Sequence, residues 1–585
     1  MRIAVGTEEQ LLRTLDSALD RPLFAADPPR HADEYARRTY AQLEVVNELV
    51  GGASTLLKDS RKMAAVLEWT AVVDPSLFAA AAIHYAVVLT SIRDLGRPDA
   101  SLVTATDRLD RLDAVGAILI TELGQGNNHI ALQTQAHYEP ETRTFRLHTP
   151  HPGARKLMAS IALPGVAKIG TVYADLIVAG QSRGTFAFVV PLRERSGLTP
   201  GVVVEPLPGT SPVPLDYSIA SFEGVRVPYD HWLRDSASIS GAGEYLDPLG
   251  SADRRMLRSL CLSAWASLAG AVGLAAAARA AVAVALRYAN KRTTLGRLSP
   301  NRPVLDYQTQ RHALYGALSE AYAVTALVRH AVEDFLARPW SVEEAPTDEG
   351  AITWSPWVAA HRGNALAKAA AAEICAGVAG ECRRRSGAQG VLSANRIIAY
   401  EGMAESYNSA GGDNLLILLD AARSMIEGPA PDRPVDRVVG DLTDARERLH
   451  LVRHQEATLH LELAEAVRHD AGSPFESWNP HLVDAVALAT THQRRLVAEA
   501  FRHAVAAEEP GPARDALAAA ELLYGLRDLH EHRAWHLERG TLHATAARTL
   551  GGLVDAAVDG VGRHADTLLA GLGLPTRRLN SRMVP

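Results

Sequence analysis

The chain has 585 residues, more than one hydrophobic core usually serves, so we expect two to four domains. Its net charge of −7 and pI near 6.3 argue against a nucleic-acid-binding protein, because phosphate backbones require a concentrated basic surface. Three cysteines without a C-x-x-C spacing fit a reducing compartment, and no apolar leader follows Met1, so we expect a cytoplasmic protein.

Along the chain, the spacing of apolar residues indicates helices first, then strands, and then helices again. Apolar residues Leu43, Val46 and Val50 share one face of a helix, whereas short runs such as Thr185 to Val190 alternate with Gly and Pro and indicate strands. A Pro-rich linker is expected at 428–434. The predicted domains are an N-terminal α-domain (1–113), a middle β-domain (114–248), an α-helical bundle (249–430) and a C-terminal α-domain (431–585).

The stretch from Ser259 to Ala278 contains no charged residue and has the length of a membrane span. It is mostly Ala, Gly and Ser, and Arg279 and Arg287 continue the same helical pattern. We therefore predict a tightly packed core helix and no membrane partner.

Five segments in chain order carry the strongest functional signal. They are Thr121-Glu-Leu-Gly-Gln-Gly-Asn-Asn128, Arg292-Thr-Thr-Leu-Gly296, Asp306-Tyr-Gln-Thr-Gln310, Cys382-Arg-Arg-Arg-Ser-Gly-Ala-Gln-Gly390 and Ser409-Ala-Gly-Gly-Asp-Asn414. Together they resemble the flavin-site segments of the acyl-CoA oxidases, within the acyl-CoA dehydrogenase superfamily. The resemblance implies a mostly α, α+β fold with a helical N-terminal domain, a β-barrel-like middle domain, a helical bundle and an extra C-terminal helical domain.

The same resemblance implies that the chain binds FAD as a homodimer. The arginine at 292 offers a planar, permanently charged fork for a pyrophosphate, and glycines allow backbone to approach a dinucleotide closely. In the family, the arginine and the Gly-rich segment complete the cofactor site of the neighbouring subunit. The predicted cofactor-binding residues are Thr121, Gly126, Arg292, Gln308, Gly387, Gln389, Gly390, Asp413 and Asn414.

The catalytic base of the family is missing, because Gly411 stands where the oxidases carry a glutamate. The segment after Lys156 also departs from the family pattern. Glu405 and Asp413 are the candidate replacement bases, and Glu401 and Asp253 are further carboxylates near the site. A base must reach hydrogen-bond distance of the proton it takes, which sequence alone does not decide.

We therefore expect an FAD-dependent oxidoreductase acting on an acyl thioester of CoA or of a carrier protein, in specialised metabolism. Two alternatives stay open: a flavin-dependent monooxygenase of the same fold, which needs no thioester base, or a non-catalytic subunit that completes the flavin site of a homologous partner. No nicotinamide site is expected, because Gly124-Gln-Gly126 lacks the third glycine of that fingerprint.

A metal site is not expected either. His532 and His536 lie one helical turn apart, but spacing singles out no third ligand. We interpret His450 and His454, which have the same spacing, as part of a solvated helix face.

Overall fold

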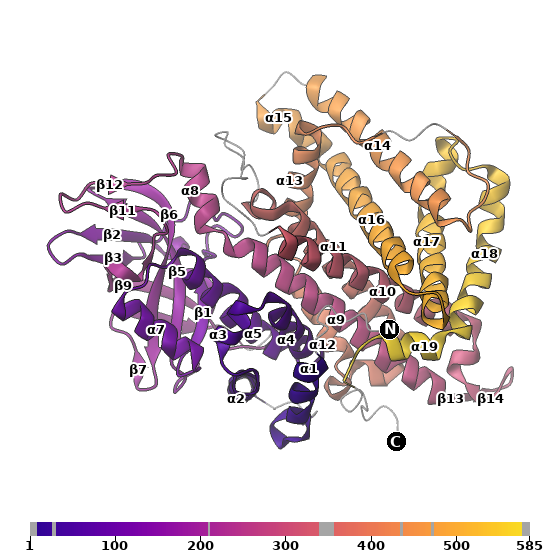
Figure 1. Ribbon diagram of the computed structural model, residues 1–585, viewed down its shortest axis with the longest axis horizontal. Helices are drawn as coiled ribbons and strands as arrows, with labels where there is room; N and C mark the ends of the chain where they lie inside the picture. The colour runs from indigo at the N-terminus through magenta and orange to yellow at the C-terminus, as the bar shows by residue number, and fades with distance from the viewer. Residues whose placement is uncertain are drawn as a thin grey trace.

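The computed structural model describes residues 9–25, 31–208, 211–338, 356–432, 437–469 and 473–575. Helices occupy both ends of the chain, and one large sheet lies between them in sequence and at one side of the molecule in space (Figure 1). The fold is mostly helical with a central sheet domain, as the sequence predicted. Residues 433–434 of the expected linker lie outside the described residues.

The N-terminal helices are short and closely packed. Asp74 caps one of them by accepting hydrogen bonds from the amides of Ser76 and Leu77, with Pro75 in the first helical position. Leu43, Val46 and Val50 are all buried, which confirms the predicted apolar face. The elements are α1 (Glu9–Asp16), α2 (Ala32–Val50), α3 (Ala53–Lys58), α4 (Ser60–Val73), α5 (Pro75–Ala81), the π-helical segment η3 (Ala82–Leu89), α6 (Thr90–Leu95) and α7 (Ala100–Asp110).

The middle part of the chain forms a ten-stranded sheet with its own aromatic core around Phe145, Phe186 and Trp232. The main path runs β10-β6-β5-β2-β3-β9-β4, while β1 pairs in parallel with β5. The strands are β1 (Val115–Leu119), β2 (Gln135–Glu139), β3 (Thr144–His148), β4 (Lys156–Ser160), β5 (Lys168–Val178), β6 (Gln181–Glu194), β7 (Gly197–Leu198), β8 (Val202–Pro206), β9 (Tyr217–Pro228) and β10 (Trp232–Leu233); β11 (Ser238–Ile239) and β12 (Tyr245–Leu246) form a separate pair.

A helical bundle follows, built around one long apolar helix, α9 (Leu262–Lys291). Two stretches, Pro75–Leu95 and Ala252–Lys291, are long and apolar enough to cross a membrane, but 94% and 100% of their most apolar windows are buried inside the structure. The core-helix interpretation of 259–278 therefore fits. The other elements are α8 (Ala252–Ser259), the hairpin strands β13 (Thr293–Gly296) and β14 (Ser299–Pro303), α10 (Gln308–Ala337), α11 (Pro356–Arg385), α12 (Ile397–Ser406) and α13 (Asn414–Glu427).

The Ala-rich surface of α9 is covered by this chain itself. Helices α4, α10, α11 and α12 pack around it, so its apolar content is no argument for a second subunit. Arg279 of α9 is fully buried and pairs with Glu68 of α4, and it also donates to the carbonyl of Leu572 at 3.3 Å. The helix thereby ties the N-terminal helices to the end of the C-terminal domain.

The C-terminal domain is helical and packs along α10 and α11 (Figure 1). Its helices are α14 (Ala445–His469), α15 (Pro474–Trp478), α16 (Leu482–Ala507), α17 (Pro512–Glu538), α18 (Ala544–Arg563) and α19 (Ala565–Gly571). Buried ion pairs link them, for example Arg494 with Asp528 at 2.7 Å and Arg448 with Glu521 at 2.6 Å.

Candidate functional site

Two loops that are far apart in sequence meet between the sheet and the helical bundle. The side-chain amide of Asn127, in the loop after β1, donates to Asp413 at 3.1 Å. Trp357, at the start of α11, packs on the same loop: a Cβ on Gly412 would lie 3.0 Å from its indole ring. The structure thus brings the predicted residues of the Thr121 loop and of the Gly411–Asn414 loop to one place.

The backbone explains why glycine stands at the position of the missing base. Gly411 and Gly412 have φ angles of +68° and +97°, in the left-handed region that favours glycine. A Cβ on Gly411 would point into the bundle, 3.5 Å from Cε of Lys368 and 3.6 Å from the carbonyl oxygen of Ala266. A side chain at 411 would therefore approach Lys368 if the loop kept this conformation.

Lys368 of α11 holds this loop, and the sequence analysis did not predict a role for it. Its side chain is fully buried and donates to the carbonyl of Gly412 and to Oδ1 of Asn414, the latter at 2.8 Å. Burial lowers the pKa of Lys368 to about 7, against the opposing charge of Asp413. A lone lysine inside the Ala-rich run 365–372 was the available signal.

Both candidate bases make structural interactions. Oδ1 of Asp413 caps α13 by accepting from the amides of Leu415 and Leu416, at 2.9 and 3.3 Å. Glu405 is exposed and accepts from the side-chain amide of Asn408 at 3.0 Å.

Of the two other carboxylates, Glu401 forms an ion pair with Arg383, and Asp253 lies in the first turn of α8. A catalytic role for Glu405 or Asp413 stays a prediction.

The loop that starts at Thr121 is anchored by a buried ion pair. Lys156 lies 2.9 Å from Glu122, which also accepts from the backbone amides of Gln133 and Thr134. Burial lowers the pKa of Lys156 to about 8. Burial opposes ionisation of Glu122, but the Lys156 ammonium and the amides lower the pKa of this carboxyl. The pair fixes the loop and leaves Thr121 half-buried beside it.

The remaining predicted cofactor residues form a second cluster at the far end of α9. Arg292 follows the last residue of α9, and its guanidinium lies 3.6 Å from where a Cβ on Gly387 would stand. A Cβ on Gly390 would overlap the carbonyl of Arg383, so glycine is required there. Gln389 accepts two hydrogen bonds from Asn395, at 2.8 and 3.0 Å. Gln308 is exposed at the first turn of α10.

The two clusters cannot form one site within one chain. Gly411 lies beside Ala266, near the start of α9, whereas Arg292 lies 26 residues further along. At a rise of 1.5 Å per residue, the helix separates them by about 39 Å. The first cluster consists of the Thr121 and Asp413 loops. The second contains Arg292, which is exposed and forms no ion pair with a described carboxylate.

These residues suit a bound dinucleotide. A Cβ on Gly126 would meet nothing within 4 Å, so there is open space beside the backbone of this loop. Arg292, Gly387 and the first turn of α10 place a planar cation, close backbone and a helix N-terminus together, which suits phosphate oxygens. The residues of the two clusters therefore fit FAD.

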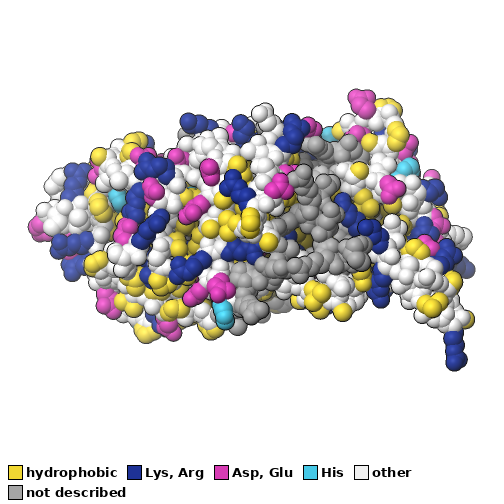
Figure 2. Space-filling view, turned by 90° about the horizontal axis from the view of Figure 1, so that it is seen from below, with side chains coloured by type: hydrophobic (Ala, Val, Ile, Leu, Met, Phe, Trp, Pro, Cys, Tyr) yellow, Lys and Arg dark blue, Asp and Glu magenta, His cyan; other side chains and the backbone are white. Residues whose placement is uncertain are grey.

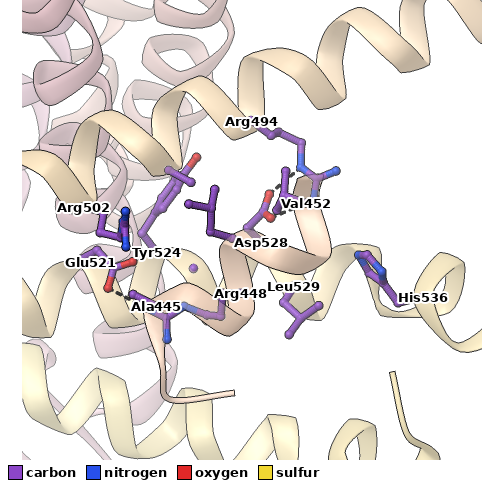
Figure 3. A pocket seen from close by; sticks show the side chains of 13 residues that line it. Ala445, Arg448, Val452, Arg494, Arg502, Glu521, Tyr524, Asp528, Leu529 and His536 are labelled. Carbon is purple, nitrogen blue, oxygen red and sulfur yellow. Dashed lines mark hydrogen bonds and ion pairs between the residues drawn. The ribbon is translucent and has the colours of Figure 1, made fainter. Parts of the chain in front are cut away.

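The cavities of the C-terminal domain are separate from both clusters. One, of about 20 Å³, holds room for about one water among the paired charges Arg448, Glu521, Arg494 and Asp528 (Figure 3). A larger one, of about 810 Å³, lies between α10, α11 and α16 to α18. None of the predicted cofactor residues lines either cavity.

Among the described residues, no group of three or more His, Cys, Asp or Glu side chains is arranged to hold a metal ion. His532 interacts through Nδ1 with the carbonyl of Asp528, and His536 is buried against Thr541. The interpretation of His450 and His454 as a solvated face was wrong for His454, which is only 5% exposed and contacts the ring of Trp535. Packing of α14 against α17 buries it.

Comparison with known proteins agrees with the sequence motifs. Residues 268–426 match a family model described as acyl-CoA oxidase, C-alpha1 domain, and residues 445–583 match one described as acyl-CoA oxidase. The chain belongs to the acyl-CoA oxidase/dehydrogenase superfamily.

Individual relatives are distant. The chain is 25% identical over 462 residues to the mouse acyl-coenzyme A oxidase-like protein, covering 74% of this chain and 71% of the relative. It is 28% identical over 388 residues to peroxisomal acyl-coenzyme A oxidase 2 of Arabidopsis thaliana, covering 63% of this chain and just over half, 53%, of the relative.

The fold is also that of solved acyl-CoA oxidases. Acyl-CoA oxidase-1 of Caenorhabditis elegans, solved in complex with FAD and ATP, superimposes with a TM-score of 0.82 at 20% identity, covering 98% of this chain and 88% of that one. At this identity the likeness shows the fold, so activity is argued from the site.

Proposed function

We propose that this protein is an FAD-dependent oxidoreductase that removes hydrogen from the α and β carbons of an acyl thioester. The observation that carries the proposal is the retention of two cofactor clusters at opposite ends of α9. Family membership and the printed names of the relatives support the substrate class. FAD, when bound, would supply the acceptor for hydride from the β carbon.

The residues of the chain divide the work between them. The backbone and side chain of Thr121, with Gly126, would hold the flavin half, while Asn127 and Asp413 lock the two loops together. Arg292 and Gly387 would bind the pyrophosphate.

The division of the site implies a homodimer, in which the Arg292 cluster of one subunit would serve the Thr121 cluster of the other. The hairpin β13–β14 protrudes next to Arg292 (Figure 1), and its Leu295 and Leu298 are 78% and 97% exposed. Exposed leucines on a projecting hairpin are suited to contact with a second copy.

CoA or a carrier protein would present the acyl group. On the face shown in Figure 2, the lysines and arginines of the described residues are interspersed with acidic and apolar side chains, so these residues form no concentrated basic surface there for nucleic acid.

We further propose a cytoplasmic location, which the three buried, unbridged cysteines suit, and a role in specialised metabolism.

The test is an absorption spectrum of the purified protein, followed by anaerobic mixing with butanoyl-CoA, octanoyl-CoA and the matching acyl carrier proteins. A flavin spectrum that is bleached by a thioester supports the proposal. A protein that binds added FAD but is not bleached by any thioester, and that consumes oxygen only with a separate reductant, would favour the monooxygenase alternative. No flavin binding at all would overturn the proposal.

A further inference from the structure

His129 is a buried histidine without a protein hydrogen-bond partner. The side chain is 7% exposed, and neither Nδ1 nor Nε2 has a partner among the described residues. The other buried histidines of the described residues have at least one bonded ring nitrogen, and His84 has both: its Nδ1 accepts from the amide of Gly116, and its Nε2 contacts the carbonyl of Leu109. In the described part of the chain, His129 is the one histidine with both nitrogens buried and unpartnered. A buried polar group of this kind calls for another partner.

The position of His129 places it at the proposed reaction site. It lies two residues after Asn127, which bonds Asp413, and its ring centroid is 6.3 Å from that of Trp357. Trp357 in turn packs against Gly412. His129 is therefore next to the loop in which Gly411 occupies the position of the family's catalytic glutamate.

The charged groups that face His129 are Lys156 and Glu122, and they bind each other at 2.9 Å. Burial, helped by Lys156 and opposed by Glu122, lowers the pKa of His129 to about 4. The imidazole is therefore neutral at pH 7, with one nitrogen able to accept a proton.

The carboxylates that sequence offered instead are engaged elsewhere. Asp413 caps α13 and accepts from Asn127, and Glu405 is exposed and bonded to Asn408. Neither combines burial with a free acceptor, whereas His129 does.

We propose that His129 is the catalytic base of this chain and takes the proton from the α carbon of the bound acyl thioester. The inference rests on the proposed function. The Cα–H bond breaks and its proton passes to a ring nitrogen of His129. The electron pair left on Cα forms the Cα=Cβ double bond as the hydride leaves Cβ, and oxidised FAD, when bound, would supply the acceptor for that hydride.

The experiment measures α-hydrogen exchange directly. Wild-type protein is incubated with butanoyl-CoA in D2O under anaerobic conditions, and deuterium at the α carbon is followed by mass spectrometry. His129→Gln and His129→Asn retain a polar side chain but not a base. Both should slow exchange at least about 100-fold, since positioned bases contribute 10²–10⁴-fold. The flavin absorbance and the melting temperature should stay near those of wild type.

The matched control is His151→Gln, because His151 is an exposed histidine of the same domain, and this variant should exchange like wild type. The pH profile gives a second test. Exchange by His129 should be flat from pH 6 to 9, above its pKa, whereas a rise from pH 6 to 8 would assign the base to a group of higher pKa, such as Lys368 or Lys156.

The outcomes separate the two proposals. Wild-type exchange that both His129 variants retain would overturn the role of His129 and leave the oxidoreductase proposal standing. If the variants unfold, a wild-type profile that rises from pH 6 to 8 would still overturn the role of His129. Wild-type protein that binds neither flavin nor thioester would overturn both.

Discussion

Cε of Lys368 lies 3.5 Å from the point where a side chain at Gly411 would begin. The lysine reaches past this point to donate to the carbonyl of Gly412 and to Asn414. The buried side chain of Lys368 therefore occupies the space toward which a side chain at position 411 would point. The loop's two consecutive left-handed glycines follow from that geometry.

Replacing Gly411 should test this arrangement. Gly411→Ala should lower the free energy of unfolding by about 1–2 kcal/mol, the usual cost of a non-glycine residue in the left-handed region. Gly411→Glu should not raise thioester-driven flavin reduction, because its side chain points at Lys368. Urea unfolding measures the first effect, with Gly241→Ala as the control, since a Cβ there meets nothing within 4 Å. Faster flavin reduction by Gly411→Glu would contradict the assigned geometry.

The buried Lys368 predicts a specific pH dependence of stability. The pKa of Lys368 in the fold is about 7, below the ordinary lysine value of 10.5, so between these values the unfolded chain binds more protons than the native protein. Stability relative to Lys368→Met should therefore rise with pH from 7 to 9.5, by at most about 1.4 kcal/mol per pH unit. The exposed Lys291→Met variant should show no such trend. A difference that falls with pH would be incompatible with the lowered pKa.

Arg292 is predicted to carry the cofactor phosphates. The Arg292→Ala variant should bind FAD with at least about tenfold lower affinity than wild type, because a charge-assisted contact is lost. Arg297→Ala, on the same hairpin, is the control. Titration with FAD, followed by flavin fluorescence, measures both. Full flavin retention by Arg292→Ala through gel filtration would remove the assignment.

Asp413 distinguishes a helix cap from a base. Asp413→Ala should destabilise the protein by about 0.5–2 kcal/mol through loss of the α13 cap, whereas Asp413→Asn should keep most of the stability because asparagine also caps helices. Thermal unfolding measures both variants. If Asp413→Asn instead abolished α-hydrogen exchange while remaining folded and flavin-bound, Asp413 would be the base and His129 would not.

The hairpin leucines are predicted to lie in the dimer contact. The double variant Leu295→Asp/Leu298→Asp should weaken self-association at least about tenfold, because it places two charges in an apolar contact. Light scattering over a dilution series measures it, and Leu246→Asp, at a leucine 52% exposed in the sheet domain, is the control. Dilution should also release flavin, since each site is divided. A wild-type monomer saturated with FAD would refute the shared site.

The class of fold, mostly helical with a central sheet domain, could be predicted from the sequence alone. The apolar helical face of Leu43, Val46 and Val50 is a local signal, and all three residues are buried in the structure. Local motifs also picked out Arg292 and Gly387, which the structure brings together. These succeed because periodicity, caps and glycine positions depend on residues near in sequence.

The surroundings of the site could not be predicted from the sequence, because they depend on contacts between distant segments. The contact between Asn127 and Asp413 joins residues 286 positions apart, and no local pattern encodes it. Burial of His129, and of Lys368 beneath Gly412, likewise depends on how the sheet and bundle pack. Packing of α14 against α17 buried His454, which spacing alone had placed on a solvated face. Burial, unmet hydrogen bonds and shifted pKa values arise from long-range packing, so the candidate base emerged from the fold.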